Sequence, residues 1–462
     1  MSTLTVASTA REMAAAVRAR QVSARELLEM HLARIEERNP ELNAIVSLDI
    51  ERAMKGAWAA DDHLARGGVL GPLHGLPLAV KDTHAVAGWR TTYGSPLYAE
   101  HVPDTDDLIV ERVRRAGVVL IGKTNVPEFA AGSHTFNTVF GTTRNPVDPS
   151  RSAGGSSGGA AAALAAGMVP LADGSDMGGS LRNPASFCGV VGLRPSLGRV
   201  PEWPQPNHWE TTSVGGPLAR NVGDVALLLS VLAGPDRRSP LALGDPGTAF
   251  APPLSDTLRG LRVAWSLDLG GSFEVDHEVA RVTEDAGRLM ARNGARTFGA
   301  WPELEHADET FRTLRAWHFQ ARYGALLREH PEAFKESLAD NIRAGESLTG
   351  ADVAEAYERR TELAQRMRSF FADYDVLVLP VSQVPPFTAD QEFPREINGQ
   401  PLGSYLDWMR SAYFITVTGC PAISVPAGTT PDGMPVGVQI VAPHGADRRL
   451  LGIAAAFEAA RG

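Results

Sequence analysis

The sequence predicts an α/β fold organised as one large domain, with helices packed on a sheet. From about residue 70, short runs rich in β-branched residues alternate with helical patterns. Of the 462 residues, 44% are hydrophobic and 21% are charged, which is typical of a folded, water-soluble protein. Neither an internal repeat nor a Pro-, Gly- or Ser-rich linker divides the sequence. One domain over residues 1–462 is therefore favoured over two independent units.

Two N-terminal helices are predicted within about residues 8–38. The segments TARE (Thr9–Glu12) and SARE (Ser23–Glu26) each place Thr or Ser three residues before Glu, which is the capping-box pattern. The second box leads into apolar residues at helical spacing. We expect that helix to end before Pro40, because proline disfavours the helical conformation in the residue before it.

Strands and helices are then expected to alternate in a catalytic core of about residues 70–235. The segment of about residues 268–375 is mostly charged and helical in pattern, so we expect a helical insertion there. Strands return after it, and a helix closes the sequence. The expected strands are LPLAV (76–80), VVLIG (118–122), DVLVLPV (375–381), AISVPAG (422–428) and VGVQIVAP (436–443), and the expected helices are DLIVERVRRAG (107–117), EVARVTEDAGRLMARNGA (278–295) and DRRLLGIAAAFEAA (447–460).

The overall charge excludes some classes of partner. With 44 basic and 54 acidic residues, the net charge is −10, which argues against nucleic acid or an anionic membrane as the main partner. The longest apolar run, residues 160–172, is shorter than the roughly 18 residues that a membrane span needs. The first residues show no secretory signal, so we expect a cytoplasmic protein.

The cysteine and histidine content gives no support for a metal site. Cys188 and Cys420 are too few for a disulfide framework or a structural zinc site. The 12 histidines form no H-E-x-x-H pattern, so a zinc hydrolase has no support. We expect no metal.

Two glycine–serine clusters indicate acyl-transfer chemistry. AGGSSGG (153–159) holds Ser156 and Ser157 between pairs of glycines, and DGSDMGGS places two glycines directly before Ser180. A serine after two glycines can turn its own N–H and theirs toward one point, which is the layout of an oxyanion hole. One cluster is therefore interpreted as the source of a nucleophile and its oxyanion donors.

A serine nucleophile needs a base, because an unassisted hydroxyl is weakly nucleophilic. GLPLAVKD offers Lys81 at the end of an apolar, strand-like run. Burial lowers the pKa of a lysine because the charged form is disfavoured, so a buried Lys81 would accept a proton near neutral pH. From this stretch alone, a solvated surface lysine is the commoner explanation.

A phosphate-binding loop is an alternative use of the segment GVVLIGKT (Gly117–Thr124), which matches G-x-x-x-x-G-K-[ST]. Such a site needs an exposed glycine-rich loop after a strand. The four middle residues are apolar and typical of the strand itself, and Gly117 fits the end of the preceding helix. We do not expect an ATP site here.

A Ser-His-Asp esterase is a second alternative. GGSSG also satisfies G-x-S-x-G, the nucleophile elbow of α/β-hydrolases. The pattern needs a histidine downstream, and His444 in APHGADR is the candidate. Only its position in the sequence singles it out.

Ordered blocks of the sequence resemble the amidase signature family, densely over residues 70–200 and more loosely in the C-terminal quarter. The resemblance implies a central mixed β-sheet covered by helices on both faces, and hydrolysis of carbon–nitrogen bonds in amides. The matching blocks are GLPLAVKDTHAVAGWRTTYGSPL, GKTNVPEFA, FGTTRNPVDPSRSAGGSSGG, DGSDMGGSLRNPASFCGVVGLRPS and TGCPAISVPAG.

The resemblance also implies a Ser–cisSer–Lys triad. By position in the matching motifs, Ser180 corresponds to the nucleophile, Ser156 to a bridging serine in a cis peptide, and Lys81 to the base. The expected reactants are a small amide, carbamate or ester and water, with no metal or organic cofactor. The implied oxyanion donors are the backbone N–H groups of Met177, Gly178, Gly179 and Ser180.

Neighbouring residues of the motifs are expected to support this triad. Ser157 is expected to join its hydrogen-bond network, and Asp176 and Arg182 to shape the turn at the nucleophile. Many relatives carry GTDTGGS where this chain carries GSDMGGS, which changes the residues at Ser175 and Met177. Met177 would contribute only its N–H, so the change should leave the oxyanion hole intact.

Aromatic residues outside these blocks are candidates for an acyl or aryl pocket. Ordinary core or loop packing explains each of them singly just as well. They make aryl amides or aryl carbamates the favoured substrates, with esters as a side reaction. The candidates are Trp203, Trp209, Trp317 and Tyr405.

Two further alternatives use the same fold. One is the amidase subunit of a tRNA-dependent amidotransferase, which an acidic chain without a basic patch makes less attractive. The other is a binding protein that lost its activity, which the intact Lys81, Ser156 and Ser180 oppose.

Overall fold

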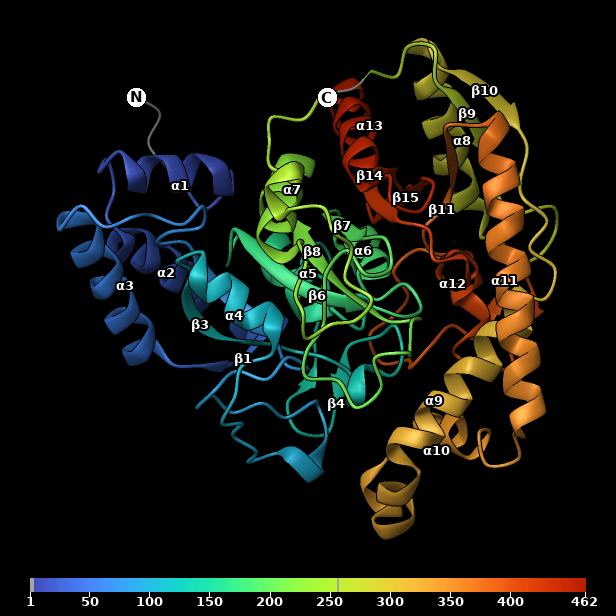
Figure 1. The fold of residues 1–462 in the computed structure, drawn as a ribbon, viewed down its shortest axis with the longest axis horizontal. Coiled ribbons are helices and arrows are strands. Elements are labelled where there is room, and N and C mark those ends of the chain that lie inside the picture. The colour runs from blue at the N-terminus through green and yellow to red at the C-terminus, as the bar shows by residue number, and fades with distance from the viewer. Residues whose placement is uncertain (1–3, 256) are drawn as a thin grey trace.

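The computed structural model describes residues 4–255 and 257–462 (Figure 1). Its centre is an eight-stranded sheet of β6 (Leu171–Asp176), β7 (Val191–Arg194), β8 (Val214–Ala219), β9 (Arg262–Trp265), β10 (Arg296–Gly299), β11 (Val376–Pro380), β14 (Ala422–Thr429) and β15 (Pro435–Val441). The strand order is β10-β9-β11-β15-β14-β7-β8-β6. β9 pairs in parallel with β10 and β11, and the other neighbours are antiparallel. The sheet is therefore mixed, as predicted.

Helices cover both faces of this sheet (Figure 1). The helices of the described residues are α1 (Ala10–Arg18), α2 (Ala24–Leu42), α3 (Ile50–Ala65), α4 (Leu108–Arg115), α5 (Gly158–Ala165), α6 (Arg182–Cys188), α7 (Val222–Leu232), α8 (His277–Arg292), α9 (Ala307–Glu329), α10 (Glu336–Arg343), α11 (Gly350–Asp373), α12 (Arg410–Thr418) and α13 (Asp447–Arg461). Of these, α5, α6, α7, α8 and α13 contact strands of the large sheet. Short 3-10 turns occupy Pro96–Tyr98, Glu128–Ala130, Gly247–Phe250, Pro331–Ala333 and Asp407–Met409.

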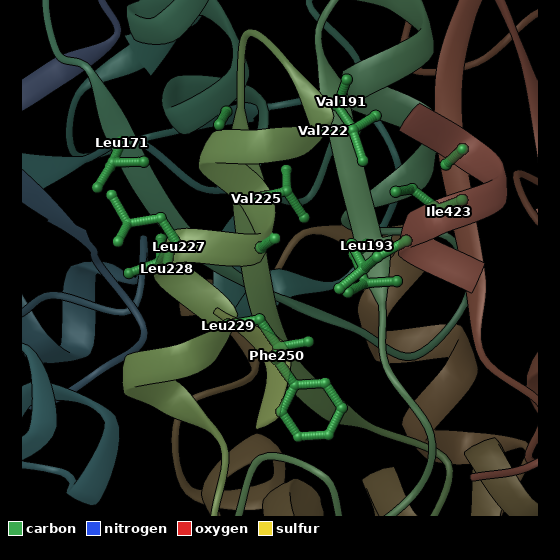
Figure 2. Packing of buried hydrophobic residues seen from close by; sticks show 14 of the residues in the cluster. Leu171, Val191, Leu193, Val222, Val225, Leu227, Leu228, Leu229, Phe250 and Ile423 are labelled. Atoms are coloured by element: carbon green, nitrogen blue, oxygen red, sulfur yellow. The ribbon is translucent and has the colours of Figure 1, made fainter. Parts of the chain in front are cut away.

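Strand β11 shows how the two faces are filled. Val376 and Val378 pack in one buried cluster with side chains of α7 and α13, while Leu377 and Leu379 pack in another with side chains of α6 and α12. Successive strand residues point to opposite faces, so a run that is apolar throughout marks a strand buried on both sides. Figure 2 shows the first cluster, in which α7 covers the strand residues of the sheet. The predicted α/β fold class is confirmed.

A second, three-stranded sheet carries the residues nearest to the predicted base. It has the order β1-β3-β2, with β2 parallel to β3 and β1 antiparallel. β2 ends at Lys81 and lies in contact with β6 of the large sheet. The strands outside the large sheet are β1 (Ile45–Leu48), β2 (Pro77–Lys81), β3 (Val119–Thr124), β4 (Phe136–Asn137), β5 (Gly141–Thr142), β12 (Glu396–Ile397) and β13 (Gln400–Pro401).

Both N-terminal capping boxes form as predicted. In each, the Thr9 or Ser23 hydroxyl accepts the N–H of the glutamate three residues on, and that glutamate accepts the N–H of the cap. The predicted end of the second helix before Pro40 is wrong. α2 continues to Leu42, because proline in the final turn forfeits a single backbone bond and Asn43 in the left-handed region closes the helix.

The segment of residues 268–375 contains α8, α9, α10 and α11, together with a strand. This strand, β10, pairs in parallel with β9 at the edge of the large sheet. α9 and α11 pack against each other on one side of the molecule, opposite the side that holds α1–α3 (Figure 1).

The phosphate-loop pattern at Gly117–Thr124 is a strand, as the sequence interpretation favoured. Gly117 follows α4 with a φ of 90°, and β3 starts two residues later. The lysine of the pattern, Lys123, is fully buried and donates to the Thr91 hydroxyl at 3.0 Å. No helix in the described part of the chain is both long and apolar enough to cross a bilayer.

Candidate active site

The predicted base lies inside the protein. Lys81 has 0% of its surface exposed, and its Nζ lies 2.9 Å from the hydroxyl oxygens of Ser156, Ser157 and Ser175. Burial lowers the pKa of Lys81 to about 7, against the opposing attraction of Asp173 and Asp176. Three hydroxyl oxygens match the three N–H donors of an ammonium, and loss of one proton leaves a lone pair that can accept from one hydroxyl. Lys81 is therefore arranged to exchange a proton near neutral pH.

The first serine cluster is held by backbone contacts. The peptide bond between Gly155 and Ser156 is cis, as the resemblance implied, and the Ser133 hydroxyl donates to the Gly155 carbonyl at 2.6 Å. A Cβ on Gly158 would lie 2.3 Å from the Thr135 hydroxyl oxygen, so only glycine fits there. The glycines of AGGSSGG thus allow α5 to start beside its neighbours at close range.

The second serine cluster meets the first. Ser180 lies between β6 and α6, and its carbonyl accepts the N–H of Ser157 at 3.1 Å. Ser156, Ser175 and Ser180 line one cavity of about 720 Å³. The structure therefore brings all three predicted triad residues to one place: Lys81 contacts Ser156, and Ser156 shares its cavity with Ser180.

The oxyanion donors differ from the prediction at Gly179. Its N–H donates to Asp176 Oδ1 at 3.0 Å, and Gly179 is not among the described residues that line the cavity. Met177, Gly178 and Ser180 line the cavity, and within the described residues their N–H groups have no hydrogen-bond acceptor. These three N–H groups remain as donors for an oxyanion.

Asp176 and Arg182 form a buried ion pair behind this turn. The Arg182 guanidinium donates to both carboxylate oxygens, at 2.9 and 3.0 Å, and Asp176 also accepts the Leu181 N–H at 3.1 Å. Burial by itself would raise the pKa of Asp176, but Arg182 and Arg194 hold it well below its ordinary value. Asp176 accepts N–H groups on both sides of Ser180, so the pair holds the backbone of this turn.

One face of α9 forms a wall of the cavity. The residues of this face are Arg315, His318, Phe319, Arg322 and Tyr323. Their spacing of three and four residues places them on one side of the helix. Arg315 is buried and donates to Met177 Sδ at 3.0 Å, which ties this wall to the residue beside the oxyanion donors.

Of the four aromatic candidates for the pocket, Trp203 lines the cavity. Among the described residues that line it, Trp209, Trp317 and Tyr405 do not appear. Trp209 is 66% exposed, and Trp317 points to Tyr357 of α11 with ring centroids 6.2 Å apart. Tyr405 lies behind the wall, where its hydroxyl accepts from Arg315 at 2.8 Å.

The structure does not support the esterase alternative. His444 is exposed, bonds to the Leu197 carbonyl at 3.3 Å and lines a separate cavity. Ser156 lies in the first cavity with Lys81 Nζ at its hydroxyl. Lysine, rather than histidine, is the base that the geometry offers.

Sequence reasoning missed three contributors to the site. Ser175 was noticed only as a departure from a motif, yet it contacts Lys81 Nζ. Asp173 and His84 carried no motif, although both stand close in sequence to residues that were singled out. Asp173 accepts the backbone N–H of Lys81 at 3.1 Å and bonds His84 Nδ1 at 2.6 Å. Their placement depends on the contact between the two sheets, which no local pattern reveals.

Comparisons with known proteins agree with this geometry. The Amidase family model matches residues 26–451. An acylamidase from Rhodococcus erythropolis is 39% identical over 455 residues, which cover 98% of this chain and 95% of that protein. A glutamyl-tRNA(Gln) amidotransferase subunit from Synechococcus sp. (strain CC9605) is 36% identical, with 95% and 94% covered.

A solved structure is similar throughout. The structure of a bacterial aryl acylamidase belonging to the amidase signature enzymes superimposes with a TM-score of 0.90 and 31% identity, over 98% of this chain and 96% of that one. The family match, the relatives and the fold agree over nearly the whole length. The chain belongs to the amidase signature family and is a hydrolase of amide carbon–nitrogen bonds.

Proposed function

We propose that this enzyme cleaves small acyl amides, aryl amides among them, through an acyl-enzyme on Ser180. The observation that carries the proposal is the buried Lys81 amine, whose Nζ lies 2.9 Å from the Ser156 hydroxyl in a cavity shared with Ser180. Burial lowers the pKa of Lys81 to about 7, so a substantial fraction of the amine is uncharged at neutral pH. An uncharged amine can act as the general base that a serine nucleophile requires.

The mechanism transfers protons through Ser156. Neutral Lys81 takes the Ser156 proton as Ser156 takes that of Ser180, and Ser180 Oγ forms a bond to the carbonyl carbon. The carbonyl oxygen becomes an oxyanion facing the N–H groups of the turn that carries Ser180. The relay then returns a proton to the nitrogen as the C–N bond breaks, because an unprotonated amide nitrogen is a poor leaving group. Water cleaves the acyl-enzyme by the same proton path.

The walls of the cavity support aryl substrates. Tyr93, Phe129, Trp203, Phe319 and Tyr323 line it, and aromatic side chains stack favourably on an aryl ring. The names of the acylamidase and aryl acylamidase relatives point the same way. Aryl carbamates would react through a carbamoyl-enzyme on the same serine, and esters as a side reaction.

A substrate panel tests this proposal. The purified chain is assayed with 4-nitroacetanilide, a 4-nitrophenyl carbamate, a fatty amide and 4-nitrophenyl acetate, beside Ser180→Ala. We expect turnover of the anilide that falls by at least about 10³-fold in Ser180→Ala, because the acyl-enzyme cannot form. Arg343→Ala, a change on the exposed end of α10, is the control and should keep full activity. Anilide turnover that survives in Ser180→Ala would contradict the proposal.

A second candidate is the amidase component of an amidotransferase complex. It is favoured by relatives named as glutamyl-tRNA(Gln) amidotransferase subunits, one of which matches at 36% identity over 95% of the chain. Such a component would work with partner proteins. Hydrolysis of the anilide by the isolated chain supports the free-standing enzyme, whereas glutamine hydrolysis that needs added partner proteins supports the complex.

A further inference from the structure

A buried carboxylate joins the predicted base to the cavity wall. Asp173, on β6, is 2% exposed and accepts the backbone N–H of Lys81 at 3.1 Å through Oδ1 and 3.4 Å through Oδ2. The second oxygen, Oδ2, also lies 2.6 Å from His84 Nδ1, which donates to it. The carboxylate therefore bridges the two ends of the turn that runs from Lys81 to His84.

His84 is fixed in this position by its backbone as well. Its N–H donates to the Lys81 carbonyl at 2.9 Å, and its own carbonyl accepts from the ammonium of Lys123. The imidazole lines the cavity that contains Ser156 and Ser180. A residue held at three points, with one edge toward Asp173 and another toward the cavity, has little freedom to move.

The charges around Lys81 give Asp173 a particular weight. Asp173 and Asp176 are the two carboxylates that favour the charged form of Lys81. Asp176 is engaged by the guanidinium groups of Arg182 and Arg194 at 2.9 and 3.3 Å. Asp173 has no arginine partner among the described residues, so its negative charge acts on the lysines and on His84.

Other charged groups also lie around His84. Besides Asp173, His84 faces the carboxyl groups of Asp107 and Glu202. Burial raises the pKa of both carboxyl groups, and His84 offsets part of that rise. The Lys123 ammonium lies at its carbonyl. Asp173 is thus the carboxylate to which His84 is hydrogen-bonded, within a group of charges of both signs.

We propose that Asp173 is a positioning residue for Lys81, fixing its backbone and supplying the negative charge it meets inside the protein, and that His84 holds the Asp173 carboxylate from the cavity wall. The proposal uses the proposed function in naming Lys81 as the base. Neither residue needs to touch substrate. If Asp173 and His84 only stabilised the turn from Lys81 to His84, their substitution would leave the pKa of Lys81 unchanged.

A direct titration separates these roles. The sequence contains only four lysines, Lys55, Lys81, Lys123 and Lys335. Labelling the lysine ε-carbons with ¹³C therefore gives four NMR signals, assigned by single Lys→Arg variants. We expect Lys81 to titrate near pH 7 in the parent and about 1 pH unit lower in Asp173→Asn, because a favourable negative charge is lost while the shape is kept.

Matched variants keep the test decisive. Asp224→Asn removes a buried carboxylate that bonds the start of α1 and should leave the Lys81 titration unchanged. His84→Ala removes the hydrogen bond that holds the Asp173 carboxylate in place, so the Lys81 midpoint should fall. His84→Asn keeps an N–H at this position and should return the midpoint to the parent value. If Asp173→Asn does not fold, the Lys81 midpoints of His84→Ala and His84→Asn still test the proposal. An unchanged Lys81 midpoint in folded Asp173→Asn, or in His84→Ala where Asp173→Asn does not fold, would overturn the proposal.

The kinetic readout uses 4-nitroacetanilide. In Asp173→Asn the ascending limb of kcat/KM should move to lower pH by the same amount as the NMR midpoint, with KM nearly constant. An effect confined to KM would overturn the positioning role, because it would place the residue in substrate binding. The NMR titration needs no turnover. A parent protein without amidase activity would therefore refute the proposed function, while the Lys81 titration would still decide the role of Asp173.

Discussion

A single lysine with three hydroxyl neighbours is the smallest unit on which the proposed chemistry depends. Sequence reasoning found Lys81 and Ser156 because they stand in recognisable motifs. It assigned no role to Ser175, the residue that supplies another of the three contacts at 2.9 Å. It also counted the Gly179 N–H among the oxyanion donors, where the structure directs that group to Asp176 at 3.0 Å. Motifs identify residue types, but the direction of an N–H depends on the fold of the turn.

Ser175 gives a prediction at this scale. Ser175→Ala removes one acceptor from the Lys81 ammonium, so the ammonium is less favoured and the pKa of Lys81 falls further. We expect the ascending limb of kcat/KM, which rises as Lys81 loses its proton, to move to lower pH and the plateau to fall by about 10-fold. Ser175→Thr keeps the hydroxyl and should retain the parent pH profile of kcat/KM for 4-nitroacetanilide. Equal pH profiles of kcat/KM for Ser175→Ala and the parent would show that the contact between Ser175 and Lys81 does not affect the reaction.

At the scale of secondary-structure elements, α9 shows where sequence patterns succeed and where they fail. The helix itself follows from its pattern, but the aromatic chosen from it, Trp317, lies on the wrong side. Two residues along a helix rotate a side chain by about 200°, so Trp317 faces α11 while Arg315 and Phe319 face the cavity. The three- and four-residue spacing of the cavity face was visible in the sequence, but nothing local said which face met substrate.

The two faces of α9 make a testable pair. Tyr323→Ala removes an aromatic side chain from the cavity, and we expect KM for 4-nitroacetanilide to rise about 5-fold, equivalent to about 1 kcal/mol of lost aromatic contact. Trp317→Ala, on the opposite face, is the control and should leave KM unchanged. Steady-state kinetics at fixed pH measure both. A larger KM effect for Trp317→Ala would reverse the assignment of the faces.

Across the whole molecule, the site lies where two sheets meet. The three-stranded sheet contributes Lys81 and the eight-stranded sheet contributes Asp173 and Ser175. The capping boxes and the strands β2, β3, β11, β14 and β15 were predictable because their signals are local. The contact between β2 and β6 joins residues that are far apart in sequence. The same holds for the pairing of β9 with β10, a strand that lies inside the segment expected to be helical. The family resemblance, rather than any local pattern, predicted that Lys81 and the serines would meet.

Arg182 connects distant parts of this architecture. Besides Asp176, it donates to the Ala412 carbonyl and Thr416 hydroxyl of α12 and to Gln439 of β15. Arg182→Ala leaves a buried carboxylate without this partner, and we expect the free energy of unfolding to fall by about 3–5 kcal/mol with loss of amidase activity. Urea denaturation measures the loss, with Arg343→Ala at the exposed end of α10 as the control. A change below that of the control would show that Arg194 suffices for Asp176.

The proposed mechanism requires that Ser180, and no other serine of the two clusters, forms the covalent intermediate. Its most direct test treats the chain with a fluorophosphonate at pH 8 and maps the modified peptide by mass spectrometry. We expect one adduct, on Ser180, that is lost in Ser180→Ala and formed far more slowly in Lys81→Met. An adduct on Ser156 or Ser157, or labelling of Ser180 that is equally fast without the lysine, would contradict the account.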